Sequence, residues 1–140
     1  MKLYFILLLG FCVATGWLCG QDAKSKPNAE IVTKLEEIVK IRERQAESVT
    51  LQYEMGQVPS TQLATANSQL AESRIALAEE LGSKEDVVVY LLDLVKSQKM
   101  LHDRTKALFD DGRSTADDMR GIQASLLESE VRLLRAQEAE

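Results

Sequence analysis

The sequence predicts an all-α fold, in which two tandem antiparallel helical hairpins form a coiled-coil-like bundle of four long helices after a signal peptide. Three observations support this prediction. The segment that begins at Leu35 aligns without a gap with the segment that begins at Leu91, 56 residues further on. Apolar residues in both copies recur at spacings of three and four, as they do on one face of a helix. A glycine interrupts each copy at the same place, Gly56 and Gly112. A repeat of this period indicates that one supersecondary unit was duplicated.

Residues 1–20 are predicted to be a signal peptide. Lys2 provides a positive start, and residues 3–18 carry no charge over a length typical of a signal sequence rather than of a membrane span. Cleavage after Gly20 is the preferred prediction, and cleavage after Gly16 is the alternative. Lipidation at Cys19 is the weaker interpretation, because the usual leucine and small residue do not precede this cysteine. We therefore expect an exported protein that is periplasmic or associated with the outer membrane.

The first hairpin repeat is predicted over residues 29–82, after a flexible leader at 21–28. Asn28 is the expected N-cap of a helix over 29–54, whose apolar stripe is Ile31, Leu35, Ile38, Ile41 or Arg42, Gln45, Val49 and Tyr53. Gly56 is expected to end this helix in the left-handed conformation. Ser60, which follows Pro59, is expected to cap a second helix over 61–81, and Gly82 closes that helix.

The second hairpin repeat is predicted over residues 83–140. Ser83 and Asp86 form a box-like start for a helix over 84–110, which Gly112 ends. Ser114, together with Asp117, is expected to cap the last helix over 115–138. Short turns make consecutive helices antiparallel, so the turns at Gly56 and Gly112 should lie at the same end of the bundle.

The two turns share a pattern that resembles a known family. An aromatic residue, Tyr53 or Phe109, stands three residues before the glycine, and a serine, Ser60 or Ser114, follows within four. The helices that follow carry the matching stretches Leu63, Ala66, Leu70, Ser73, Leu77 and Met119, Ile122, Leu126, Ser129, Leu133. This pattern resembles the periplasmic helical repeat of TolC-type outer-membrane efflux proteins. Barrel strands of about ten residues have no counterpart in the sequence, so the resemblance covers only the helical part.

The resemblance implies that the tips of the hairpins contact another protein, since the tips of efflux channels face a periplasmic adaptor. The corresponding residues here are Gly56, Gln57, Val58, Gly112, Arg113 and Ser114. The expected partners are a periplasmic adaptor protein or an efflux assembly, and a homo-oligomer is a further hypothesis. The function implied is a part in efflux transport across the envelope. The alternative is a periplasmic coiled-coil structural or scaffolding protein with no transport role.

Composition and motifs argue against other classes of function. The formal net charge of −5 would repel nucleic acid. Both cysteines, Cys12 and Cys19, lie in the signal peptide, so the mature chain has no thiol. His102 is the single histidine, expected at the solvated surface, and no metal-ligand spacing surrounds it. We therefore predict no catalytic, cofactor or metal site and no small-molecule substrate. Tyr53 and Phe109 are expected to close the end of the helical core.

Overall fold

The computed structural model describes residues 26–139, which form four helices: α1 (Ala29–Glu54), α2 (Ser60–Leu81), α3 (Lys84–Asp110) and α4 (Ala116–Glu138). The predicted all-α fold is confirmed, since the four helices pack against one another and no strand occurs in the described part of the chain. The helix bounds agree with the prediction to within one residue. The predicted signal peptide, and the leader up to residue 25, lie outside the described residues.

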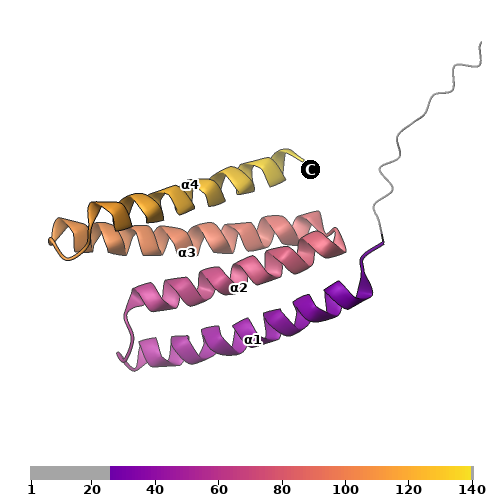
Figure 1. The fold of residues 1–140 in the computed structure, drawn as a ribbon, viewed down its shortest axis with the longest axis horizontal. Coiled ribbons are helices and arrows are strands. Elements are labelled where there is room, and N and C mark those ends of the chain that lie inside the picture. The colour runs from indigo at the N-terminus through magenta and orange to yellow at the C-terminus, as the bar shows by residue number, and fades with distance from the viewer. Residues whose placement is uncertain (1–25, 140) are drawn as a thin grey trace, which may run out of the picture.

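The helices lie side by side in the order of the sequence (Figure 1). The backbone of α1 is adjacent to that of α2 only, α2 lies between α1 and α3, and α3 lies between α2 and α4. The turns that follow α1 and α3 lie at one end of the molecule, which we call the tip end, and the α2–α3 turn lies at the other, the base end (Figure 1). The bundle is therefore open, with α2 and α3 inside and α1 and α4 at its edges.

Two of the predicted helix starts are correct in position. Asn28 is the N-cap of α1, and its side-chain oxygen accepts a hydrogen bond from the backbone N–H of Glu30 at 3.0 Å. Ser83 is the N-cap of α3, but its hydroxyl donates to the carboxylate of Asp86 at 2.6 Å and caps no backbone group.

The other two cap predictions are wrong by one residue. Pro59 is the N-cap of α2, with an extended backbone (φ −74°, ψ 158°), and Ser60 is the first helical residue. The ring of proline holds φ near this value, so Pro59 itself sets the turn into the helix and Ser60 makes no capping bond. Thr115, not Ser114, is the N-cap of α4, and its capping-box partner is Asp118, not Asp117.

The core lies between α2 and α3. It consists of Ala71 and Ile75 from α2 with Leu91 and Leu94 from α3, and Leu133 of α4 packs against it. Ile75 and Leu94 are the largest side chains that are fully buried among the described residues. Most other buried positions are small: Ala46, Ala64, Ser68, Ala71, Ser73, Ala78, Ser97, Thr105 and Ser129. Small side chains let the helices approach closely but bury little apolar surface, so the large residues Ile75, Leu91 and Leu94 carry much of the hydrophobic stabilisation.

The apolar stripe predicted for α1 is only partly buried. Leu35 and Val49 are partly buried, but Ile31, Ile38 and Ile41 are exposed. The buried position in α1 is Ala46, one residue beyond the predicted Gln45. The reason is that α1 has a neighbour on one side only, so half of a broad apolar stripe remains in contact with solvent.

Two arginines connect helices across the bundle. Arg74 of α2 pairs with Glu43 of α1 at 2.9 Å, and its guanidinium carbon lies 5.7 Å from the ring centre of Tyr90 in α3. Arg132 of α4 pairs with Glu72 of α2 at 2.7 Å. These contacts orient α1 and α4 relative to the two inner helices.

Candidate functional site

Each hairpin tip is built by a Schellman motif, the helix ending in which a left-handed residue lets two backbone N–H groups bond back to the last turn. In the first tip, Gly56 N–H donates to Tyr53 O at 2.9 Å and Gln57 N–H to Gln52 O at 2.8 Å. Gly56 has φ 72°, which glycine adopts without the strain that a side chain would cause.

The second tip repeats this geometry. Gly112 N–H donates to Phe109 O at 2.9 Å, Arg113 N–H donates to Leu108 O at 2.7 Å, and Gly112 has φ 71°. The predicted left-handed role of both glycines is therefore confirmed. The first helix of each repeat ends in the same kind of turn, so the two tips present backbone of the same shape at the same end of the molecule (Figure 1).

The predicted contact residues lie on these turns. Gln57 and Arg113 are exposed, whereas Val58 and Ser114 are partly buried. Gln57 and Arg113 both directly follow the left-handed glycine of their turn, and Val58 and Ser114 come next. Of the predicted contact side chains, each tip therefore exposes one, an amide in the first and a guanidinium in the second.

The aromatic residues before the glycines do not close the core, contrary to the prediction. Tyr53 and Phe109 are each 42% exposed. Only two helices meet at each tip, so an aromatic ring there packs on one side and meets solvent on the other. Leu51 and Met55 are also exposed near the first tip. The tip end therefore carries apolar surface that a partner could cover.

The start of α4 gives the second tip a carboxylate with a fixed position. Thr115 Oγ1 donates to Asp118 Oδ2 at 2.6 Å, Thr115 N–H donates to the same oxygen at 3.2 Å, and Asp118 N–H donates to Thr115 Oγ1 at 3.1 Å. The hydrogen bond from the threonine hydroxyl, followed by that from its backbone, lowers the pKa of Asp118 below 3.8. These hydrogen bonds hold the carboxylate of Asp118 in place at the start of α4.

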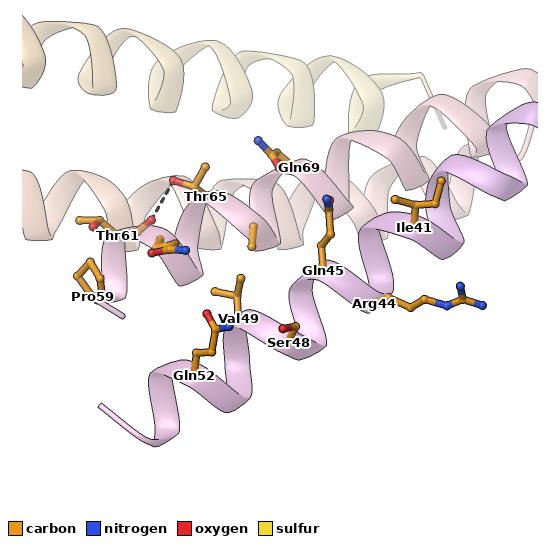
Figure 2. A pocket seen from close by; sticks show the side chains of 12 residues that line it. Ile41, Arg44, Gln45, Ser48, Val49, Gln52, Pro59, Thr61, Thr65 and Gln69 are labelled. Atoms are coloured by element: carbon orange, nitrogen blue, oxygen red, sulfur yellow. Dashed lines mark hydrogen bonds between the residues drawn. The ribbon is translucent and has the colours of Figure 1, made fainter. Parts of the chain in front are cut away.

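A groove of about 820 Å³ lies between α1 and α2 in the half of the first hairpin nearest the tip (Figure 2). Gln45, Val49 and Gln52 point from α1 toward α2, and Thr61 and Thr65 come from α2 (Figure 2). Glutamine, serine and threonine side chains dominate the lining, which consists of Ile41, Arg44, Gln45, Ser48, Val49, Gln52, Pro59, Thr61, Gln62, Thr65, Ala66 and Gln69. Sequence reasoning missed this groove, although the absence of charge between Glu54 and Glu72 was a signal for it.

The outer side of α4 carries an apolar stripe that the sequence analysis also missed. Leu127, Val131 and Leu134 are exposed and recur at spacings of four and three, so they share one side of the helix. Leu126, Ser129 and Leu133, which are partly or fully buried, form the side that packs on α3. Helix α4 is thus apolar on two sides, although it has one neighbour.

His102 is 20% exposed and its Nδ1 lies 3.2 Å from Asp103 Oδ1, so it is less solvated than predicted. Within residues 26–139, no cluster of three histidine, cysteine or acidic side chains is arranged to hold a metal ion. None of the four helices is both long and apolar enough to cross a membrane. No family model, curated protein or solved structure matches the chain.

Proposed function

We propose that this protein is an exported subunit of an efflux assembly in the cell envelope, in which it acts through protein contacts at its hairpin tips. The observation that carries the proposal is that both copies of the turn with an aromatic residue three positions before the glycine lie at one end of an open row of helices. The exposed residues of the two turns supply the contacts at this end. The turn pattern resembles that of TolC-type proteins, whose tips face an adaptor.

The proposal includes association of copies of the chain through the edge helices. Helix α4 exposes the stripe of Leu127, Val131 and Leu134, and α1 exposes Ile38 and Ile41. Ile38, Val131 and Leu134 lie in the base half of their helices, and Ile41 and Leu127 lie near the middle. Helix α1 runs from base to tip and α4 runs from tip to base (Figure 1). A copy that places α1 against the α4 of its neighbour continues the antiparallel order and keeps every tip at the same end.

A paired change at the tips tests the partner contact. Val58→Glu with Arg113→Glu puts carboxylates on both turns, where neither side chain belongs to the core. We expect the native protein to co-purify with an adaptor or pump component from the envelope of its own cells, and the double variant to lose that component. Circular dichroism should show unchanged helix content.

The control places the same arginine substitution at the base end. Arg135→Glu lies in the last turn of α4, far from the tips, and should keep the partner. Retention of the partner by the tip variant would refute tip docking. The protein would then contact its partner through its sides, which is the behaviour of the alternative, a periplasmic scaffolding protein with no transport role.

A further inference from the structure

The two hairpins differ in the seam, the surface along which the two helices of one hairpin pack on each other. The internal repeat shows which residues differ. At the offset of 56 residues, Gln45 and Gln52 correspond to Leu101 and Leu108, and Ala66 corresponds to Ile122. The second hairpin therefore places three large aliphatic side chains where the first places two amides and a methyl group. All three are partly buried. The groove of the first hairpin occupies the space that these larger side chains would fill.

The groove is almost without charge. No aspartate, glutamate, lysine or arginine occurs between Glu54 and Glu72, whereas the equivalent segment of the second hairpin contains Asp111, Arg113, Asp117, Asp118 and Arg120. Among the residues that line the groove, Arg44 alone is charged. Interface cores are depleted in charged residues because ions are costly to dehydrate. The composition of this groove is therefore that of a surface which another polypeptide can cover.

The carboxylates of α1 lie away from the groove. Glu43, Glu47 and Glu54 line a separate depression together with Arg74. Arg44 forms no ion pair with another residue in the described part of the chain. The guanidinium of Arg44 thus lies without an ion pair at the edge of the groove, and Arg42, which also forms no ion pair in the described part of the chain, bonds to Gln45 and Gln69 at the base end of the groove. Arginines beside neutral amides and hydroxyls favour an occupant with a carboxylate over one with an ammonium group.

The packing within this chain shows what covers such a seam. At the base end, Leu133 and Ala136 of α4 pack against the core between α2 and α3. In the base half of the α1–α2 seam, Gln98 and Leu101 of α3 line a depression together with Leu35 and residues of α2. In both places a third helix contributes the covering side chains. In the tip half of the α1–α2 seam, α1 and α2 with the turn between them provide the whole lining.

Hydrogen bonds across the seam mark the end of the groove nearest the base. Arg42 Nη1 donates to Gln45 Oε1 at 2.9 Å and to Gln69 Oε1 at 2.8 Å, so it connects α1 to α2. The side-chain amides of Gln52 and Gln62, nearer the tip, have no hydrogen-bond partner among residues 26–139. The groove is therefore bridged at its base side and offers free donors and acceptors toward the tip.

We propose that this groove binds an amphipathic helix of a partner protein, which enters from the tip end. The contacting side of that helix consists of small apolar residues, and a carboxylate beside them pairs with Arg44. The second hairpin does not bind in this way because its seam is filled and its tip is charged. This inference rests on the proposed tip contact and specifies which hairpin makes it and with what chemistry.

Two labelled synthetic helical peptides of about 20 residues, long enough to form helix in water, test the proposal against the full chain by fluorescence anisotropy. Both peptides have a contact side of alanine and leucine. In one peptide this side is flanked by glutamates, and in the other by lysines. We expect the glutamate peptide to bind at least about tenfold more tightly than the lysine peptide. Arg44→Glu should reverse this preference.

A variant that copies the second hairpin tests the position of the site. Gln45→Leu, Gln52→Leu and Ala66→Ile together should lower the affinity for the glutamate peptide at least about tenfold, with an unchanged or higher denaturation midpoint. Gln123→Leu, on the exposed side of α4, adds apolar surface elsewhere and should leave binding unchanged. If this triple variant, which we call the filled-groove variant, binds the glutamate peptide as tightly as the native chain does, the proposal is overturned. The absence of binding at about 1 mM of the glutamate peptide would also overturn it.

Sedimentation without peptide tests a second copy as the occupant. If the oligomeric state changes in the filled-groove variant but not in Gln123→Leu, the groove is occupied by another copy of this chain and the helix proposal is overturned. The tip variant Val58→Glu with Arg113→Glu separates the two proposals. If that variant keeps its envelope partner while the native chain binds the glutamate peptide in the groove, tip docking is wrong and the groove site stands.

Discussion

Leu94→Ala is expected to be the most destabilising single truncation in this protein. Leu94 is fully buried, with 0% of its surface exposed, in the cluster that α2 and α3 form. Truncation of a buried leucine to alanine costs about 2–5 kcal/mol, because apolar contacts are lost and a cavity remains. The upper part of that range applies to a rigid surrounding, which cannot collapse into the space. Here the side chains around Leu94 belong to α2 and α3, and each of these helices packs between two others. We therefore expect the truncation to cost about 3–4 kcal/mol.

This loss is large relative to the total free energy of unfolding. Domains of this size have unfolding free energies of about 5–15 kcal/mol, and in the described part of this chain the other large apolar side chains that are buried are Ile75, which is 1% exposed, and Leu91, which is 2% exposed. Urea denaturation followed by circular dichroism measures the change. The midpoint of Leu94→Ala should fall sharply, while the slope of free energy against urea should remain similar if the native state stays compact.

Leu134→Ala is the matched control, because it removes the same atoms from a side chain that is 60% exposed. It should cost less than about 1 kcal/mol in the monomer. Both variants must be measured at several protein concentrations, since association through α4 would stabilise the native protein by mass action. Equal costs for the two variants at low concentration would refute the assignment of the core to the α2–α3 seam.

Three further predictions concern the turns, the capping box and the edge. Gly56→Val and Gly112→Val should each lower the unfolding free energy by roughly 1–2 kcal/mol or more; no atom lies within 4 Å of an added Cβ, so backbone strain at positive φ is the cause, and unchanged midpoints would contradict it. The pKa of Asp118 is lower in the folded chain than its ordinary value of 3.8, so its contribution to stability is complete above that value and is lost as the pH falls through the lowered pKa; the stability difference between native protein and Asp118→Asn should therefore shrink in acid, and a constant difference would count against the capping box. Leu127→Gln with Leu134→Gln should lower the mass measured by sedimentation equilibrium while the helix content stays the same, and a native protein that is monomeric at all concentrations would refute association through α4.

The positions of the helices were predictable because the signals for them are local. Gly56 and Gly112 end their helices through the backbone conformation that glycine itself allows, and Asn28 caps α1 through an oxygen two residues from its partner. The cap errors at Ser60 and Ser114 arose where two neighbouring residues could each start the helix. Pro59 and Thr115 took those positions. A change of one residue there depends on a small difference in local energy.

The candidate site was predictable only in part. The sequence indicated both turns and the tip residues that follow their glycines, because the turn pattern occurs twice. These residues are Gln57 and Val58 in the first turn and Arg113 and Ser114 in the second. The groove between α1 and α2 was not foreseen. It depends on which sides of two helices face each other, and on what the equivalent positions hold in the other hairpin. The exposure of Tyr53 and Phe109 likewise depends on the number of helices that meet at the tip.

The sequence alone determined that this protein consists of two equivalent helical hairpins joined by short turns, because helix periodicity, glycine conformation and turn length act over a few residues. The tertiary structure decided which of two equivalent residues is buried. Ile75 and Val131 occupy the same position in the repeat, yet the first is 1% exposed and the second 44%. Helix α2 lies between two neighbours, and α4 has one. A duplicated sequence repeats much of its apolar pattern in each copy, but a row of helices has two edges, so only the arrangement in space separates core residues from surface available to a partner.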